Sequence, residues 1–205
     1  MLKPVCKVAR ELCEMCEPHE FDLARIVGMI KAITVVDHVF FVQYDTPPEN
    51  PIWGEFTRWS KQPGAYAAFE TNVEIRYATH LLDKEDWLRF VICKELCHSL
   101  EAPSGKHDVS ERGVDDLVDK FSLISSAQTP PNMTRVYHLE LLAEVGAIEL
   151  LCPLQTRKEI LEKSGRPDAD ACAAIAKKYN MPIGYVDGAF DPANIAAVES
   201  VINGA

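Results

Sequence analysis

The sequence predicts an α+β fold, with a small sheet, surrounding helices and a helical extension at the C-terminal end. Apolar residues recur at helical spacing near both ends of the chain. Between them, residues 36–45 are rich in β-branched and aromatic residues, which is typical of a strand. The order of helices, then a short sheet, then helices again favours the α+β class.

The first half of the chain is expected to hold two helices and the sheet. Residues 3–17 and 21–33 have the apolar periodicity of helices, and Pro18 closes the first of them. After the strand, the Pro-rich residues 46–56 are predicted to form a loop. Residues 64–82 are predicted to hold two short strands around a polar Glu-Thr-Asn segment.

The second half is predicted to be helical. The stretch from Asp86 is almost wholly apolar, so we expect a buried helix that ends near Pro103. A polar segment at 104–121 turns helical towards its end. A long helix is predicted at 133–151, with Asn132 or Thr134 as its cap and Pro153 just beyond its end. Three further helices are expected at residues 154–165, 168–180 and 192–202.

Length and composition suit one main domain with an appendage. A chain of 205 residues with 47% hydrophobic content can bury a core without the support of disulfides or a structural metal. We expect residues 1–160 to form the main domain and residues 161–205 a helical subdomain packed on it. The net charge of -10 disfavours binding to nucleic acid or to an anionic membrane. No apolar run approaches the roughly 18 residues of a membrane helix.

The cysteines point to a reducing compartment. Seven is an odd number for a disulfide framework. Cys93, Cys97 and Cys152 lie inside apolar runs, where a reduced cysteine behaves as a small hydrophobic residue. The start of the chain also lacks the apolar stretch of a signal peptide. We therefore expect a cytoplasmic protein.

The stretch Arg89–His98, "RFVICKELCH", carries the chemistry of interest. In the zinc-peptidase motif H-E-x-x-H, two histidines one helical turn apart reach the same metal, and the glutamate holds the water that the metal activates. Glu95 and His98 have the spacing of that glutamate and of the second histidine. Lys94 stands where the first histidine would be, and an ammonium ion cannot ligate zinc.

Together with a second motif, this stretch resembles the ImmA/IrrE family of metallopeptidase-like proteins. The first motif of that family resembles R-F-T-x-A-H-E-x-x-H, and the second resembles "ELLAEVGAIELLCP" at residues 140–153. The resemblance covers roughly residues 20–160 and implies a zincin-like fold. It implies that His98 and Glu140 are metal ligands and that Glu95 is the general base. Glu144 stands where asparagine is usual in the family.

The resemblance leaves two accounts of the site open. In the first, Lys94 neutralises Glu95 and Glu140 in a remnant site that binds no metal. In the second, the site still binds zinc through His98 and Glu140, and Glu144, one turn after Glu140, supplies another carboxylate. His138 is a weaker auxiliary ligand, because residues two apart on a helix do not share a face.

Three functions follow from these accounts. The first is a regulatory protein of bacterial or phage origin that binds a protein partner, such as a helix-turn-helix repressor, without cutting it and without a cofactor. The second is an active zinc endopeptidase that cleaves a transcriptional repressor. The third is a DNA-binding regulator, because residues 171–190 resemble a helix-turn-helix with a turn at Asn180–Met181. The expected second helix of that unit has no basic residue and carries Asp187, which disfavours DNA binding.

Two other groups of residues have competing interpretations. Cys6, Cys13, Cys16 and His19 have spacing that hints at zinc, but the three cysteines also fit the apolar stripe of a helix, and core packing is favoured. The aromatic residues around the Gly/Pro-rich loop either line a peptide cleft or cap the sheet, and capping is favoured; they are Trp53, Trp59, Tyr66 and Phe69.

Overall fold

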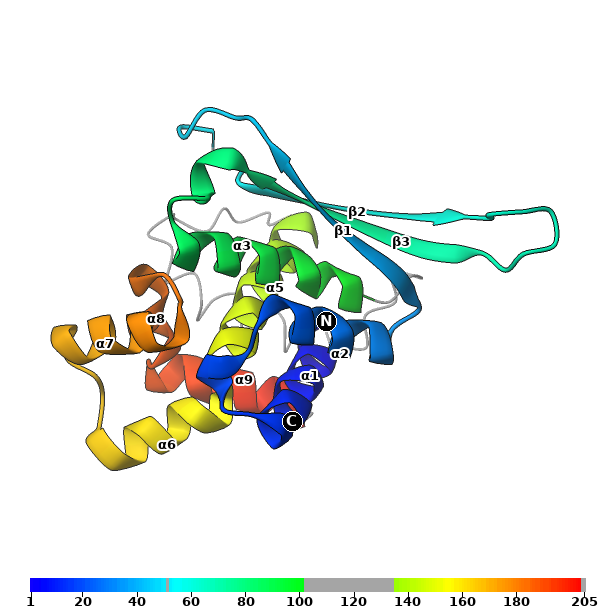
Figure 1. Ribbon diagram of the computed structural model, residues 1–205. Coiled ribbons are helices and arrows are strands. Elements are labelled where there is room, and N and C mark those ends of the chain that lie inside the picture. The colour runs from blue at the N-terminus through cyan, green and yellow to red at the C-terminus, as the bar shows by residue number, and fades with distance from the viewer. Residues whose placement is uncertain (51, 102–134, 204–205) are drawn as a thin grey trace.

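The helix that carries Lys94 and Glu95, and that ends just before His98, lies between a small sheet and a layer of helices (Figure 1). This is seen in a computed structural model that describes residues 1–50, 52–101 and 135–203, with the side chains of 135–138 left out of the description. The described residues form eight α-helices and a three-stranded mixed sheet, so the expected α+β class is confirmed.

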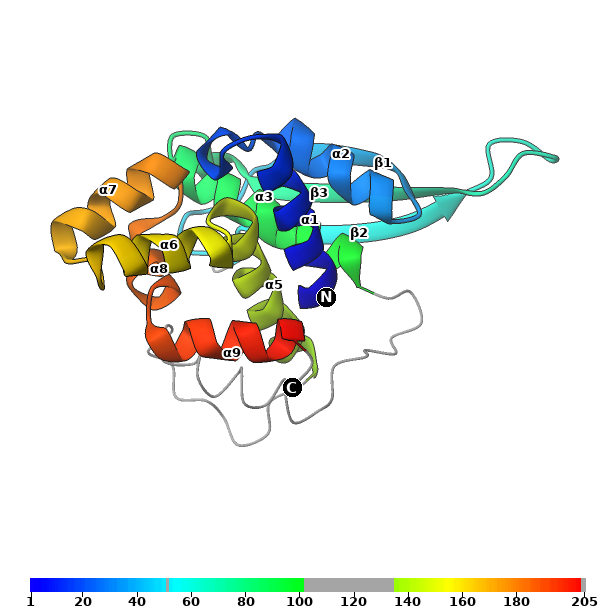
Figure 2. The ribbon, with the colours of Figure 1, turned by 90° about the horizontal axis from the view of Figure 1, so that it is seen from below.

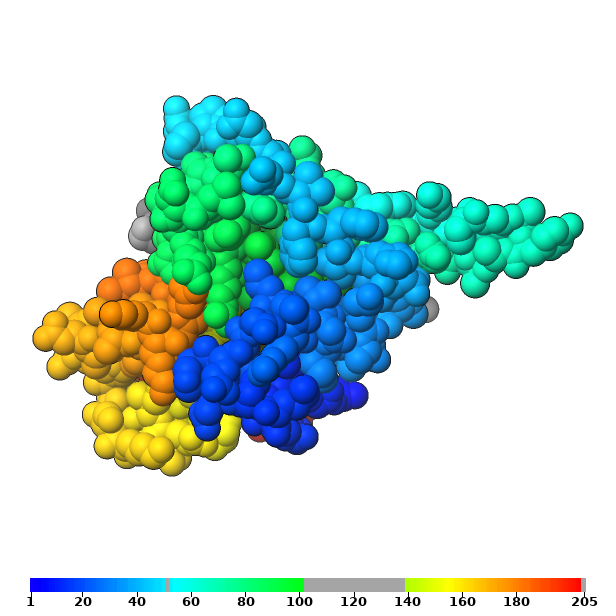
Figure 3. Space-filling model, in the orientation of Figure 1, coloured from blue at the N-terminus to red at the C-terminus, as the bar shows by residue number. Residues whose placement is uncertain are grey.

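The sheet has the strand order β1-β3-β2. Strand β1 (Val36–Tyr44) runs parallel to β3 (Glu70–Ala78), and β2 (Gly54–Lys61) runs antiparallel to β3. Val73 and Ile75 of the central strand are buried. The β2–β3 hairpin projects as an arm beyond the rest of the molecule (Figure 3).

The helices form layers below the sheet. Helix α3 (Glu85–Cys97) contacts β2 and β3 on one side and α5 (Arg135–Leu151) on the other, while α1 (Leu2–Met15) contacts α5. Helix α2 (Leu23–Ile33) joins α1 to β1. Short 3-10 turns lie at Pro18–Glu20, Thr79–Leu81 and His98–Leu100.

Four helices follow α5 at the C-terminal end. They are α6 (Leu154–Ser164), α7 (Ala169–Tyr179), α8 (Ile183–Ala189) and α9 (Pro192–Asn203). Figure 2 shows them on the side of the molecule away from the sheet, with α9 near α1. One hydrophobic core includes residues from the first helix to the last. The boundary at residue 160 stays a prediction. Within the described ranges, no helix combines the length and the apolar character that crossing a bilayer requires.

The predicted sheet was wrong in two respects. Residues 54–56 were assigned to a loop, but they begin strand β2, and residues 64–82 hold one strand instead of two. Strand β2 has no fully buried residue, and its sequence lacks the apolar alternation that identifies a half-buried strand. Pairing with β3, whose register runs from Gly54 opposite Tyr77 to Lys61 opposite Glu70, creates the strand.

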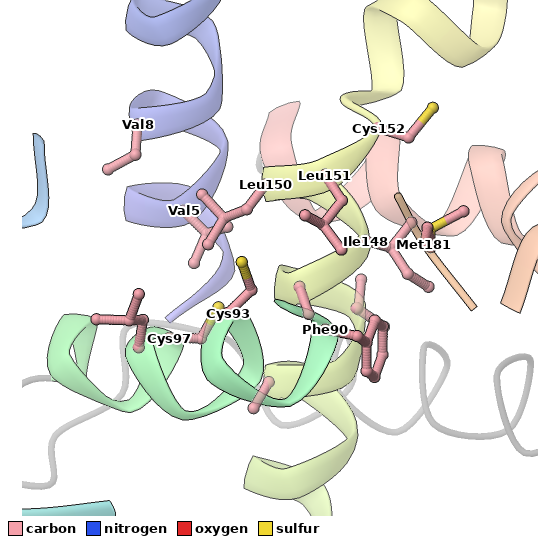
Figure 4. Close-up of a cluster of buried hydrophobic side chains, with 14 of the residues drawn as sticks. Val5, Val8, Phe90, Cys93, Cys97, Ile148, Leu150, Leu151, Cys152 and Met181 are labelled. Carbon is pink, nitrogen blue, oxygen red and sulfur yellow. The ribbon is translucent and has the colours of Figure 1, made fainter. Parts of the chain in front are cut away.

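The expected burial of the cysteines in apolar runs is confirmed. Cys93, Cys97 and Cys152 are each fully buried, and Figure 4 shows Cys93 on α3 pointing towards Val5 of α1 and Leu150 of α5. Burial raises the pKa of Cys93 to about 12, so its thiol is neutral at physiological pH. These cysteines are core residues.

Gly146 allows α5 to lie close against α3. A Cβ added there would lie 2.7 Å from Cys97 Sγ and 3.4 Å from Val5 Cγ2, which is too close for the first pair. The residue therefore sets the distance between the helix that carries Glu140 and the helix that carries Lys94 and His98.

We expect Gly146→Ala to lower the free energy of unfolding by about 1–3 kcal/mol, because the added methyl group overpacks this contact. Gly28→Ala is the matched control, since a Cβ at Gly28 meets nothing within 4 Å. Gly28 is an exposed residue in the middle of α2, so its replacement by alanine should stabilise the helix by up to about 1 kcal/mol. Urea denaturation measures both changes, and equal effects of the two substitutions would contradict the steric argument.

Candidate functional site

Helix α3 places Lys94, Glu95 and His98 at its C-terminal end. Glu95 and His98 are buried, and the Lys94 side chain is 18% exposed. His98 follows the last residue of α3, where the negative end of the helix dipole favours a cation. The start of strand β2 packs directly against Glu95. A Cβ added to Gly54 would lie only 2.7 Å from Glu95 Oε1.

Helix α5 brings Glu140 to the same place, as the linked motifs predicted. Lys94 Nζ donates a hydrogen bond to Glu140 Oε2 and lies 3.0 Å from Glu95 Oε1. His98 Nε2 lies 3.4 Å from Glu140 Oε1 and 4.0 Å from Glu95 Oε2. These four residues form one cluster, which we call the Lys94 cluster.

Two further polar residues contact His98, and neither was predicted from the sequence. His98 Nδ1 hydrogen-bonds with Glu101 Oε1 at 2.5 Å. Arg58 Nη2 donates to the carbonyl oxygens of His98 and Ser99 at 3.2 and 2.7 Å. Glu101 follows His98 by three residues, a spacing that places two side chains together in a helical turn and that could have found it. Arg58 lies on β2, which was not predicted.

The charges in the cluster shift one another's pKa values. Burial alone would lower the pKa of His98, but its bond with Glu101 and the nearby carboxylates of Glu140 and Glu95 raise it to about 9. Contact with His98 and Lys94 outweighs burial and lowers the pKa of Glu140 to about 2. Burial alone would also lower the pKa of Lys94, yet the carboxylates of Glu95 and Glu140 raise it. At neutral pH, His98, Lys94 and Glu140 are therefore all charged.

We expect the cluster to stabilise the fold most strongly between about pH 4.5 and 6.5. The pKa of His98 is raised from 6.5 to about 9, so its contribution is complete below pH 6.5 and is lost as the pH rises through 9. That loss should be on the order of 2–3 kcal/mol. The pKa of Glu140 is lowered from 4.5 to about 2, so its contribution is lost as the pH falls from 4.5 to 2.

Urea denaturation of the wild type and of His98→Gln, from pH 5.5 to 9.5, tests the histidine part. The stability difference between the two proteins should shrink as the pH rises. Buried cysteines add the same pH dependence to both proteins, so they cancel from the difference. His19→Gln, at an exposed histidine, is the control and should follow the wild type. A difference that is constant with pH would contradict the assignment.

The residues of the cluster do not fit a zinc ion. A catalytic zinc takes three protein ligands of the His, Cys or carboxylate type. Here His98 and Glu140 are the only two such groups at the motif's ligand positions, and the ammonium of Lys94 binds the second of them. Among the described residues, no three His, Cys, Asp or Glu side chains are grouped so that they could hold a metal.

The auxiliary ligands do not complete such a site. Glu144 lies on α5 one turn beyond Glu140 and lines a cavity beside the cluster. Burial, and the nearby carboxylate of Glu140, raise the pKa of Glu144 although Lys94 opposes this shift. His138 lies in the first turn of α5, and its side chain is outside the described part of the chain.

The N-terminal cysteines are separate from the cluster. Core packing was the favoured interpretation, and it is confirmed for Cys6 but wrong for Cys13, which is exposed. Cys13 directly follows the buried Leu12, and a helix turns by about 100° per residue, so it faces outward. Cys13 and Cys16 line another cavity of about 570 Å³, between α1, α6 and α9.

The loop aromatic residues do not form one group. Trp53 contacts Trp87 and His80 edge to face, with ring centroids 5.0 and 5.5 Å apart. Trp59 instead stacks on Phe40 across the sheet. Tyr66 and Phe69 are exposed on the β2–β3 arm, so the expectation that they cap the sheet was wrong.

The two helices and the intervening turn predicted within residues 171–190 are present. Helix α7 ends at Tyr179, the next residue Asn180 has a left-handed backbone with a φ of 47°, and α8 begins at Ile183. Asp187 of α8 pairs with Arg166 at 3.0 Å. Helix α8 contains no lysine or arginine, so nothing in it favours contact with phosphates.

Comparisons with protein families, curated proteins and solved structures found no match. The resemblance to the ImmA/IrrE family therefore rests on the two sequence motifs alone and stays a prediction. In the structure, residues from both motifs meet in one ion cluster. Lys94 and Glu140, which are 46 positions apart in the sequence, form a hydrogen bond there.

Proposed function

We propose that the protein is a regulatory protein of the ImmA/IrrE type that binds a protein partner in the cleft of a former peptidase and does not cut it. The observation that carries this proposal is the Lys94 cluster. An ammonium group pairs with Glu140 and Glu95 where a peptidase would place a divalent metal, and it would repel such an ion.

Two cavities beside the cluster support a binding role for this site. Cavities of about 420 and 260 Å³ lie on either side of Glu140, and both are bordered by Gly54 at the start of β2. Binding sites are usually concave and largely formed before the ligand arrives. A helix-turn-helix repressor is the kind of partner that the family resemblance implies.

Cross-linking in cells that express the protein, followed by mass spectrometry, would identify the partner. We expect the purified partner to keep its full length when it is incubated with this protein and zinc. Ile52→Arg should weaken the complex, because Ile52 is half exposed and borders the larger cavity.

Val35→Arg is the matched control, since Val35 is a comparably exposed apolar residue. Val35 lies just before β1, whereas Ile52 lies in the segment after β1. Zinc-dependent cleavage of the partner at a defined bond would replace the proposal with the peptidase alternative. A partner that binds Ile52→Arg as tightly as the wild type would place its binding site elsewhere.

A further inference from the structure

The cavity of about 420 Å³ beside the Lys94 cluster has walls of aromatic rings. Trp87 lies edge to face with Trp53 and with Tyr185, with ring centroids 5.0 and 5.9 Å apart and interplanar angles of 81° and 71°. Phe90 stacks on Tyr185 at 4.1 Å. Rings at steep angles to one another present both faces and edges to the space between them, and the faces attract cations.

The polar groups of this cavity have an excess of negative charge. Glu140 and Glu144 line it from α5, and Lys94 is the single cation among the described residues that line it. Lys94 is already held by Glu140 and by Glu95 behind it. Glu144 forms no ion pair with any described residue. Its carboxylate lies near Tyr185, whose pKa is raised by burial and by the charge of Glu144.

A carboxylate that forms no ion pair within the described part of the chain, in a half-buried cavity walled by aromatic rings, is the complement of an organic cation. A lysine side chain combines an apolar stem that packs on rings with an ammonium group that donates three hydrogen bonds. Lys94 itself shows that carboxylates in this wall accept an ammonium group. A neutral ligand would leave Glu144 without a partner.

We propose that this cavity binds the alkylammonium group of a lysine side chain of the protein partner, with Glu144 as its carboxylate and Trp53, Trp87 and Tyr185 as its walls. This inference rests on the proposed function and names what the partner must present. It assigns to Glu144 the task of recognising a ligand, instead of the auxiliary metal ligation considered from the sequence.

The test uses n-butylammonium chloride as the probe and tryptophan fluorescence as the signal. The chain has three tryptophans, and Trp59→Phe leaves Trp53 and Trp87, both of which line the cavity. Phenylalanine at 59 preserves an aromatic ring against Phe40. We expect a saturable fluorescence change with n-butylammonium and a much weaker response to n-butanol, which has the same stem without the charge.

Glu144→Gln in the same background should weaken n-butylammonium binding about tenfold, because it removes a charged hydrogen-bond acceptor. Glu162→Gln, at an exposed residue of α6, makes the same charge change elsewhere and should have no effect. Thermal unfolding of each variant shows whether it is folded.

The lysine-binding proposal fails if n-butylammonium does not saturate the signal, if n-butanol binds as tightly, or if Glu144→Gln leaves the affinity unchanged. The titration contains no partner protein, so such a failure does not bear on the proposed function. That function is tested separately by cross-linking to the partner. If cross-linking identifies no protein partner although n-butylammonium binds, the proposed function is contradicted instead.

Discussion

Replacing Arg157 by leucine is expected to lower the free energy of unfolding by about 3–5 kcal/mol, because it leaves a buried carboxylate without its partner. Arg157 pairs with Glu149, and both side chains are at most 2% exposed. Burial lowers the pKa of Arg157 to about 10, so the guanidinium is still charged at neutral pH.

Arg157 also connects three helices through its remaining hydrogen bonds. It donates to the carbonyl oxygens of Cys152, at the end of α5, and Ala189, in α8, at 3.0 and 2.7 Å. Glu149 accepts a second hydrogen bond, from the backbone N–H of Leu154 at the start of α6, at 2.9 Å. Loss of the arginine therefore removes contacts between α5, α6 and α8 at once.

Urea denaturation measures this effect, with Arg166→Leu as the control. Arg166 is half exposed and pairs with Asp187, so its loss should cost far less than the loss of Arg157. Glu149→Leu combined with Arg157→Leu should be less destabilised than Arg157→Leu alone, because the buried carboxylate is gone. Similar unfolding curves for Arg157→Leu and Arg166→Leu would show that the pair contributes little.

Lys94→Met is expected to have the second largest effect, a loss of about 3 kcal/mol at neutral pH. The apolar stem remains, but the ammonium that neutralises Glu95 and Glu140 is removed, and the Glu95 side chain is only 3% exposed. The loss should shrink as the pH falls from about 4.5 towards 2, because protonation of Glu140 relieves the unpaired charge.

Two comparisons separate this charge effect from a packing effect. Glu95→Gln added to Lys94→Met should restore part of the stability, since it removes the buried charge. Lys158→Met, at a lysine that is 38% exposed and paired with Glu199, should cost far less than Lys94→Met. A loss for Lys94→Met that does not change between pH 6 and 3 would mean that packing, and not charge, is responsible.

The sequence predicted the parts of the site that a linear motif specifies. Glu95 and His98 share the end of one helix, and the second motif led to Glu140, which the fold brings to Lys94. Helical periodicity likewise found most of the helices, because each buries one apolar face in the common core.

Contacts between distant segments were the part that could not be predicted. Strand β2 depends on pairing with β3, so its own residues gave no signal, and Arg58 was missed with it. Glu149 and Arg157 look like surface charges on helices, and only the junction of three helices buries them. Trp53 and Tyr185 are far apart in sequence and line one cavity because α8 lies beside α3.

The ratio of zinc to protein, measured by mass spectrometry of metals on the purified wild type and on Lys94→His, tests most directly whether Lys94 has taken the place of a metal. The account predicts well under one zinc per chain in the wild type. Lys94→His restores the H-E-x-x-H pattern and removes the competing charge, so it should bind zinc markedly more tightly. One zinc per chain in the wild type, or a folded Lys94→His protein that takes up no zinc at neutral pH, would contradict the account.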